Sequence, residues 1–456
     1  MLSHLAAIWT ILALLPSIKS DPFNQPDPSL TKPLPQPGNQ KYVTIGYYEA
    51  TRSQYQQPTH INWRHYTHMV FNGAWPIDQF QFTFGSDDQN RQAVNDMKQF
   101  VNSAQQNYVK PLLAVGGEQA IQVNYYYEVS PPANPISYTS APSQVLFVLL
   151  RQWSIPKDVC QKPCSTSTRL WFQGVVINWL CTQILSHIVG AGCNNRSPND
   201  VVNFGYFAQE FKNVWNEGSL IVRANFNGFI GATGNYATSE EASLLLKMST
   251  TCHDLMAYDG YTGNKGERSG PFSALTSDCP KIPYLSNGIK ELLAIMKFHG
   301  FPNSKLVLGF TGYGRVFYLP DPGFNMKNGI SQVAYGAAPA GGWTDNLNGT
   351  MDACGQKRGY EGTYLLNEIM DNGWLAPDGV TSTDVLTRYW DDCAKQPYLF
   401  NQQYLLVYDD PGSLKFKSNY ARGSGLAGIS FYYSMGFPSL FLQSAIAPWR
   451  RGEAQG

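Results

Sequence analysis

The sequence predicts an α/β protein, a closed (β/α)8 TIM barrel with a small α+β insertion domain between its seventh and eighth strands. From Lys41 onward the chain repeats a short apolar strand, a loop with glycine or an aromatic residue, and a polar stretch with helical spacing. Strands that alternate with helices favour a parallel sheet, and eight of them favour a closed barrel over an open sheet. The 456 residues are enough for one large domain with an insertion.

The eight predicted strands are short apolar runs, rich in β-branched and aromatic residues. In chain order they are YVTIGYY (42–48), THMVFNG (67–73), KPLLAVGG (110–117), FQGVVINWL (172–180), SLIVRANF (219–226), DLMAYDGY (254–261), KLVLGFTGYGR (305–315) and LAGISFYYS (426–434). Residues 318–404 are too many for a loop without structure of its own, so they are assigned to the insertion. The barrel then takes residues 41–317 for strands 1 to 7 and residues 405–450 for strand 8 and a closing helix.

The first 40 residues are expected to be an export signal and a linker. An apolar run from Leu5 to Leu15 precedes the small residue Ser20, as in a secretory signal peptide, although Lys19 follows the run and nothing basic precedes it. Because the run is shorter than the roughly 20 residues that span a bilayer, a signal peptide over residues 1–20 is favoured over a membrane anchor. Residues 21–40 carry six prolines and predict a stiff linker. We therefore expect a secreted, extracellular protein.

The cysteines suit an exported chain with disulfides. They are eight in number and widely spaced, and the close pair Cys160 and Cys164 lacks the second pair that a zinc site needs. We expect disulfides of open connectivity, no metal site and no cofactor. Asn195 and Asn348 stand in glycosylation sequons, the first weakened by Pro198. The cysteines are Cys160, Cys164, Cys181, Cys193, Cys252, Cys279, Cys354 and Cys393.

The charge balance restricts the possible partners. The 33 basic and 33 acidic residues cancel, and charged residues make up only 14% of the chain. Nucleic acids and anionic membrane surfaces both attract an excess of Lys and Arg. We therefore expect neither a nucleic acid nor a membrane as partner.

The ends of the predicted strands carry aromatic side chains and a few polar groups. Because the carboxyl ends of barrel strands surround one mouth, these side chains are expected to converge there. Any one of them is more often core or rim than a ligand contact. Together they favour an aromatic groove with few polar groups, which suits a sugar chain. They are Tyr47, Tyr48, Phe71, Trp75, Gly116, Gly117, Tyr258, Asp259, Tyr313, Arg315, Phe431 and Tyr432.

Five segments match motifs that occur together in one enzyme family. KLVLGFTGYGRVFYL (305–319) is similar to KLVLGxPxYGRxFxL, LMAYDGYTG (255–263) to MxYDxxG, and LLAVGG (112–117) to S/A-x-GG. YDDPGSLKFKSNYARGSGLAGIS (408–430) and EGTYLLNEI (361–369) are similar to two further segments. From about Tyr42 to Phe437 the chain thus resembles the chitinases of glycoside hydrolase family 18. The resemblance implies the barrel together with the chitinase insertion domain.

The fourth predicted strand departs from the family pattern where the family's chemistry lies. The pattern D-G-x-D-x-D-W-E aligns with residues 173–180 without a gap, and its acidic positions hold Gln173, Val176, Asn178 and Leu180. Alternation puts the last three of these on one face, toward the barrel interior. By the resemblance, cleavage of β-1,4 links between N-acetylglucosamine units requires the Glu as proton donor and an Asp that stabilises an oxazolinium ion. Since Leu180 can donate no proton, we expect no catalytic residue and no enzymatic activity.

The resemblance instead implies binding without hydrolysis, because chitinase-like lectins also carry Leu in place of the catalytic Glu. The expected partners are chitin or N-acetylglucosamine oligomers, and secreted fungal members imply a role in keeping chitin fragments from host immune receptors. Tyr432 takes the position of a Trp that stacks under the central sugar, and Glu118 that of another stacking residue. The predicted sugar-binding residues are Tyr47, Phe71, Trp75, Glu118, Asn178, Met256, Tyr258, Asp259, Tyr313, Arg315 and Tyr432.

Two alternatives stay open. One is a scaffold that binds a host or extracellular protein, such as a hydrolase inhibitor, which is favoured if the loop NYYYEVSPPANP (124–135) blocks the groove. The other is a hydrolase with a relocated acid, for which Glu49, Glu118 and Asp259 are the candidates. Glu118 would approach the sugar from a different strand, and a displacement of about 1 Å costs catalysis heavily. The hydrolase is therefore the least favoured of the three functions.

Overall fold

The computed structural model describes most of the barrel and the insertion. The described residues are 42–76, 82–84, 87–116, 172–178, 208, 218–225, 238, 252–261, 268–278, 288–319, 332–333, 338–345, 348–350, 357–401 and 403–450. All of them belong to the compact unit Pro35–Gly456. Outside the described residues lie the predicted signal peptide and linker, Glu118, the loop 124–135, Leu180 and Asn195.

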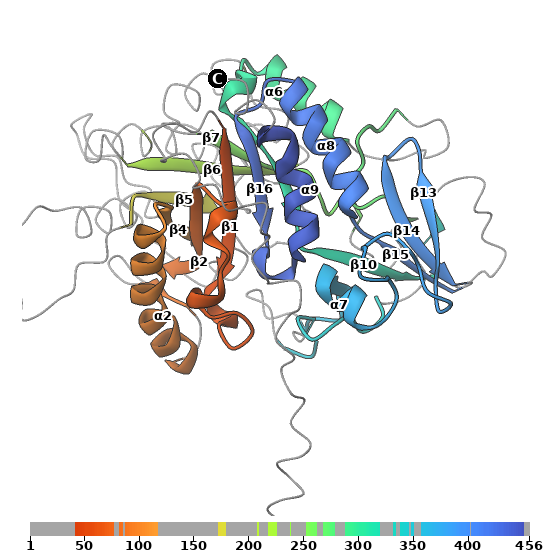
Figure 1. Ribbon diagram of the computed structural model, residues 1–456, viewed down its shortest axis with the longest axis horizontal. Coiled ribbons are helices and arrows are strands. Elements are labelled where there is room, and N and C mark those ends of the chain that lie inside the picture. Colours follow the sequence, from red (N-terminus) through yellow and green to blue (C-terminus); the bar gives the residue numbers. More distant parts are fainter. Residues whose placement is uncertain are drawn as a thin grey trace, which may run out of the picture. The chain divides into compact units, whose positions relative to one another are not determined.

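Eight parallel strands form a closed barrel (Figure 1). Around the ring the order is β1, β16, β9, β7, β6, β5, β4 and β2, and the pairing of β1 with β2 closes it. The predicted TIM barrel is therefore confirmed. The strands are β1 (Val43–Glu49), β2 (His68–Pro76), β4 (Lys110–Gly116), β5 (Gly174–Asn178), β6 (Ser219–Asn225), β7 (Cys252–Met256), β9 (Leu306–Thr311) and β16 (Gly428–Tyr432).

Alternation along the strands separates an inner layer of side chains from an outer one. Val176 of β5 belongs to the inner cluster, with Ile45, Ile221 and Val307 from other strands. The neighbours of Val176 in sequence, Val175 and Ile177, pack in the outer core instead. The predicted orientation of this strand is therefore confirmed for the residues up to Asn178.

Helices cover the outside of the barrel. Phe100 of α2 (Asp87–Gln106) packs against Phe71 of β2, with ring centroids 5.2 Å apart. Helices α8 (Pro411–Gly423) and α9 (Ser439–Arg450) lie side by side (Figure 1). The other described barrel helix is α6 (Ile289–Phe298). Short 3-10 helices are Ala50–Arg52, Pro58–His60, Trp63–His65, Asn303–Lys305 and Ser434–Gly436. Among the described residues, no helix has the length and apolar character needed to cross a membrane.

Two predicted strands have different bounds in the structure. The run 305–315 forms two strands, β9 and β10 (Tyr313–Tyr318), that separate at Gly312. A Cβ at Gly312 would lie 2.2 Å from the carbonyl oxygen of Tyr433, so the chain turns where only glycine fits. The run 254–261 continues beyond its strand, because β7 ends at Met256 and Asp259 adopts a φ of 57°.

The insertion is built around a five-stranded antiparallel sheet in the order β12, β10, β15, β14, β13. Its inner face packs with the end of β7 in one apolar cluster that contains Phe317, Tyr398 and Met256. The strands of this sheet run from Tyr313 to Val407. The sheet therefore begins before residue 318 and ends after residue 404, the limits that the sequence predicted for the insertion. The remaining bounds are β12 (Thr363–Leu365), α7 (Leu366–Asp371), β13 (Thr387–Asp391), β14 (Gln396–Asn401), β15 (Tyr404–Val407), β3 (Phe82–Thr83), β8 (Arg268–Ser269) and β11 (Gln332–Val333).

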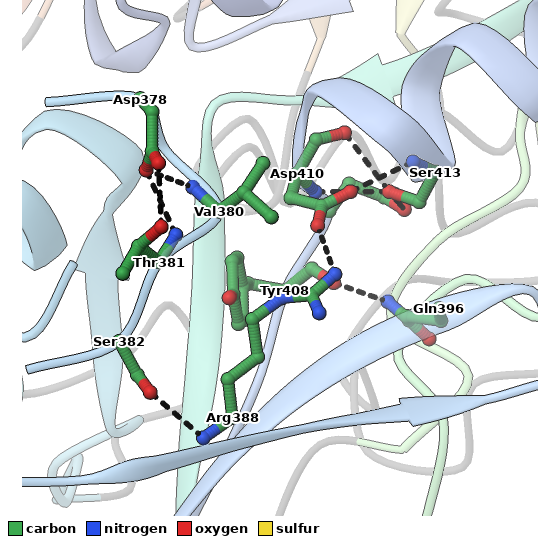
Figure 2. A network of polar contacts seen from close by, with 10 residues as sticks. Asp378, Val380, Thr381, Ser382, Arg388, Gln396, Tyr408, Asp410 and Ser413 are labelled. Carbon is green, nitrogen blue, oxygen red and sulfur yellow. Dashed lines mark hydrogen bonds and ion pairs between the residues drawn. The ribbon is translucent and has the colours of Figure 1, made fainter. Parts of the chain in front are cut away.

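The segment between β15 and α8 joins the insertion sheet to the barrel (Figure 2). Asp410 caps α8 by accepting a hydrogen bond from the Ser413 backbone N–H at 2.7 Å, and it accepts another from Arg388 of β13 at 2.6 Å. Gln396 of β14 donates to the carbonyl oxygen of Tyr408 at 3.0 Å. Asp409 forms a fully buried ion pair with Lys417, nearly two turns into the helix. The segment similar to the family's YDD motif is therefore a structural joint.

The two described cysteines are in different states. Cys393 is disulfide-bonded. Cys252 is a free thiol buried in the inner layer of the barrel, so at least this cysteine does not follow the expectation of disulfides. Asn348, in the second sequon, is exposed in a turn.

Candidate functional site

Five strands bring polar side chains together inside the barrel, above the apolar inner layer. We call this group the inner site: Tyr47 of β1, Asn178 of β5, Arg223 of β6, Asp254 of β7 and Ser430 of β16. Asp254 accepts hydrogen bonds from the Tyr47 hydroxyl at 2.6 Å and from the Ser430 hydroxyl at 2.5 Å. All five residues are buried. The inner site is thus a connected polar network in the barrel interior.

Arg223 is the centre of the inner site. Its side chain is 1% exposed. Nη1 donates to Oδ1 of Asn178 at 3.1 Å, Nη2 donates to the Tyr258 hydroxyl, and Nε lies 3.5 Å from Oδ2 of Asp254. Arg223 thus contacts one partner on β5 and two on β7 and the loop that follows it.

Two aromatic rings flank the guanidinium group. The Arg223 Cζ atom lies 4.7 Å from the centroid of the Tyr47 ring and 4.4 Å from that of the Tyr432 ring. The Tyr432 ring also stacks with that of Tyr258, at 6.1 Å and an interplanar angle of 8°. Both distances to the guanidinium are within the range of cation–π attraction, which is stronger for desolvated groups.

The surroundings of Arg223 keep it charged. Burial by itself disfavours the cation, but Tyr258, Tyr47 and Asp254 outweigh burial and raise the pKa of Arg223 above its usual value. Burial and the nearby Asp254 carboxylate raise the pKa of Tyr47, so its hydroxyl stays protonated and remains a donor. The inner site therefore holds a cation and an anion that neutralise each other.

Arg223 was not identified by reasoning from the sequence, although a signal was present. It is the only charged residue in the predicted strand SLIVRANF (219–226). It comes two residues after Ile221, so alternation places it on the inner face of the strand. A charge at an inner position requires a buried partner, and Asp254 is that partner.

A second polar group connects the end of β7 with the insertion sheet. We call Asp259, Tyr313, Arg315 and Glu361 the outer site. Asp259 accepts hydrogen bonds from the Tyr313 hydroxyl and from Nε of Arg315, both at 2.7 Å. Arg315 also donates from Nη1 to the carbonyl oxygen of Glu361 at 3.1 Å. The side chains of Asp259 and Glu361 are 28% and 48% exposed, so the outer site, unlike the inner one, meets solvent.

Glu49, at the end of β1, is a buried carboxyl group next to these sites. Its two oxygens lie 2.9 Å and 3.1 Å from Nδ2 of Asn72, which donates to them. Burial raises the pKa of Glu49 to about 7, although the hydrogen bond from Asn72 and the charges of Arg52 and Arg223 act in the opposite direction. Glu49 can therefore gain or lose a proton near neutral pH.

The structure brings together most of the described residues that the sequence predicted for sugar binding. Tyr47, Asn178, Tyr258 and Tyr432 surround Arg223, while Asp259, Tyr313 and Arg315 form the outer site. Met256 packs in the same apolar cluster as Tyr258 and Tyr313.

Other predicted residues are not brought to these sites. Phe71 and Tyr48 lie in the outer core, where their rings contact that of Phe100 in α2. They follow an inner-facing residue by one position, so alternation turns them away from the mouth. Gln173, which precedes β5, is exposed. Trp75 lies in β2 and its side chain is outside the described part, as are Glu118 and Leu180.

Apart from proton transfer at Glu49, the inner and outer sites offer hydrogen bonding, stacking and charge compensation. No cluster of three or more His, Cys, Asp or Glu side chains suited to a metal ion occurs in the described part of the chain. β5 contributes Val176 and Asn178 to the barrel interior, neither of which can act as an acid.

Comparisons with known proteins agree with the fold. A chitinase-like effector of Moniliophthora perniciosa is 23% identical over 399 residues, which is 86% of this chain and 83% of that protein. A crystal structure of a chitinase from Rhizomucor miehei superimposes with a TM-score of 0.72 at 20% identity, covering 90% of this chain and 100% of that one. A variant of the class V chitinase from Nicotiana tobaccum in complex with NAG4 gives a TM-score of 0.60 at 17% identity, covering 90% and 99%.

The family model described as glycosyl hydrolases family 18 matches residues 43–435, which include every barrel strand and the whole antiparallel sheet of the insertion. The chain therefore belongs to glycosyl hydrolase family 18.

Proposed function

We propose that this protein binds chitin-type oligosaccharides without hydrolysing them. The observation that carries this proposal is the inner site, where β5 supplies Asn178 and Val176 and where the nearest cation, Arg223, is bound to Asn178 and Asp254. A family member that cleaves sugar chains needs an acid on this strand. This chain has an amide and an aliphatic side chain there, with Leu180 in the position of the Glu.

The loss of the acid is large enough to decide between binding and turnover. A positioned general acid accelerates a reaction by roughly 10² to 10⁴. An electrostatic group that is preorganised for the transition state adds about 10² to 10³, although the two factors need not multiply. With both removed, a turnover of about 10 per second falls to minutes or hours per event.

The outer site supports the binding of a sugar. Asp259 and Arg315 present charged hydrogen-bonding groups next to the aromatic rings of Tyr313 and Tyr258, and Asp259 is partly exposed. Sugar rings combine polar edges with apolar faces, so such a mixture suits them. The solved neighbour in complex with NAG4 has the same fold, which supports N-acetylglucosamine oligomers as the ligand class.

We place this activity outside the cell. The export signal expected over residues 1–20 and the relative named a chitinase-like effector both support secretion. A secreted protein that holds chitin fragments without cutting them would keep those fragments from the immune receptors of a host.

The test is calorimetric titration of the purified protein with the N-acetylglucosamine hexamer, followed by mass analysis of the recovered sugar. We expect binding with an intact hexamer. Arg315→Ala should weaken binding about tenfold or more, since a hydrogen bond to a charged group contributes about 1.5–3 kcal/mol. Cellohexaose, which lacks the acetamido groups, is the control ligand. Absence of heat with the hexamer and of retention on chitin beads would reject the proposal and favour a protein partner.

A hydrolase with a relocated acid is the second candidate, because of Glu49. Its pKa of about 7 is suited to a general acid at neutral pH. In this case the hexamer would shorten overnight, with release of reducing ends that falls as pH rises through about 7. Glu49→Gln would abolish the release, whereas Glu291→Gln, a change at the N-terminal turn of α6, would leave it intact.

A further inference from the structure

Most polar groups of the inner site are already bonded to one another, although Nε of Arg223 is, among the described residues, a buried donor without a hydrogen bond, 3.5 Å from Oδ2 of Asp254. The two Nη atoms of Arg223 donate to Asn178 and Tyr258, and the Asp254 carboxylate accepts from Tyr47 and Ser430. Each of these polar groups would otherwise be available to a hydroxyl or amide of a ligand. Arg223, Asp254 and their partners therefore already use most of the hydrogen bonds that an entering sugar would need.

The Arg223 side chain also covers an aromatic surface. Tyr432 is the half-buried ring at the end of β16, and the guanidinium lies 4.4 Å from its centroid. A sugar that stacks on an aromatic ring needs contact with the ring face at van der Waals distance. On the face that Arg223 covers, a sugar can stack only if the guanidinium moves, and movement would separate Arg223 from Asp254 inside the barrel.

Displacement of Arg223 is energetically unfavourable. Its side chain is 1% exposed, and so is that of Asp254. Separation of a buried ion pair leaves two charges without compensation in a medium of low dielectric constant, which costs several kcal/mol. A sugar bound through a few neutral hydrogen bonds does not repay this cost.

We propose that Arg223 closes the inner end of the site and so determines how the sugar binds: an oligosaccharide contacts the outer site around Asp259 and Arg315 and does not enter the barrel interior. This inference rests on the proposed function, which it deepens by naming the residue that limits the site. It also makes Arg223 a second obstacle to hydrolysis, independent of the acid missing from the fourth strand.

Two paired variants test the closure. Arg223→Ala with Asp254→Asn removes both charges together and opens the space, whereas Arg223→Met with Asp254→Asn removes the same charges and keeps the space filled. Thermal unfolding first establishes that both fold, and each is then titrated with the N-acetylglucosamine hexamer. The opened variant is expected to bind at least tenfold tighter than the wild type, a difference of about 1.4 kcal/mol. The filled variant should bind as the wild type does, and Tyr432→Ala should remove the gain of the opened variant.

The outcomes separate this inference from the proposed function. If the wild type and the opened variant bind the hexamer with equal affinity, the closure is overturned. It is also overturned if both paired variants lose binding, because the Arg223 charge would then contact the sugar. If the wild type does not bind but the opened variant does, the proposed function fails and the closure is supported. Should the opened variant not fold, a crystal structure of the wild type soaked with the hexamer decides: sugar at the outer site with Arg223 in place supports the closure, and sugar stacked on Tyr432 with Arg223 displaced refutes it.

Discussion

Two parts of the barrel differ in whether they carry the acidic residues of the family pattern. At the start of α8, Asp409 and Asp410 are present as in the family's YDD motif, and each has a cationic partner, Lys417 and Arg388. On β5, the positions that are acidic in the family pattern hold Val176 and Asn178. The first group joins the insertion sheet to a barrel helix, whereas the resemblance to the family assigns the carboxylates of this strand to hydrolysis. Relative to the family pattern, this chain therefore has the acidic residues that join the insertion to the barrel and has no acidic residue at the two described positions of β5.

The comparison also shows two ways of placing a charge in the interior. Asp409 and Lys417 are eight residues apart on one short segment, so local structure brings them together. Arg223 and Asp254 lie on neighbouring strands and meet through sheet register, in which Arg223 pairs with Asp254. Both pairs are fully buried, so the removal of one partner from either should be costly.

The largest effect is expected at Lys417. Lys417→Met leaves Asp409 buried without a cation and should lower the free energy of unfolding by about 3–5 kcal/mol, measured by urea denaturation. The control is Lys395→Met in the surface pair with Asp392, whose side chains are 25% and 86% exposed. This control should cause little change. Similar losses in both variants would contradict the structural role of the joint.

A somewhat smaller loss is expected at Asp254. Asp254→Asn removes the anion next to Arg223 but leaves Asn178 and Tyr258 as acceptors, so the loss should be about 2–3 kcal/mol. Arg223→Met in the same chain should recover part of it, because the uncompensated cation is then absent. A double-mutant cycle by urea denaturation measures this coupling. Strict additivity of the two changes would show that the pair does not interact.

Glu49 should make stability depend on pH. Burial raises its pKa from 4.5 to about 7, so the folded state holds the proton more tightly than the unfolded chain. The stability from this group is present below pH 4.5 and is lost as pH rises toward 7, a total on the order of 3 kcal/mol. Glu49→Gln should remove this loss of stability with rising pH, as measured by unfolding at pH 4 to 8. The same pH dependence in the variant would assign it to another group.

The smallest effect is expected at the cap of α8. Asp410→Ala removes the cap and the partner of Arg388, and should cost about 1–2 kcal/mol in thermal unfolding. Asp378 offers a matched control, since its carboxylate also accepts from two backbone N–H groups, of Val380 and Thr381, but in an exposed turn (Figure 2). If Asp378→Ala destabilised the protein as much as Asp410→Ala, the contact to the barrel helix would not be what matters.

The sequence by itself determined the fold class and the orientation of β5. Eight apolar strands with helical connections predict a closed barrel, and the period of two along a strand assigns Val176 and Asn178 to its interior. The same period would have excluded Phe71 from the predicted sugar-binding residues. Phe71 follows inner-facing Val70 and therefore packs against α2. The absence of an acid at Leu180 is likewise a property of the sequence alone.

Only the tertiary structure decided which side chains surround Asn178 in the barrel interior. Arg223 meets Asn178, 45 residues away, and Tyr258, 35 residues away, because sheet register and barrel closure bring their strands together. The break of the seventh predicted strand at Gly312 depends on the carbonyl of Tyr433, more than a hundred residues later in the chain. The pKa of Glu49 depends on burial by segments distant in sequence. Sequence patterns report local period and composition, whereas charge compensation and burial depend on which segments the fold makes neighbours.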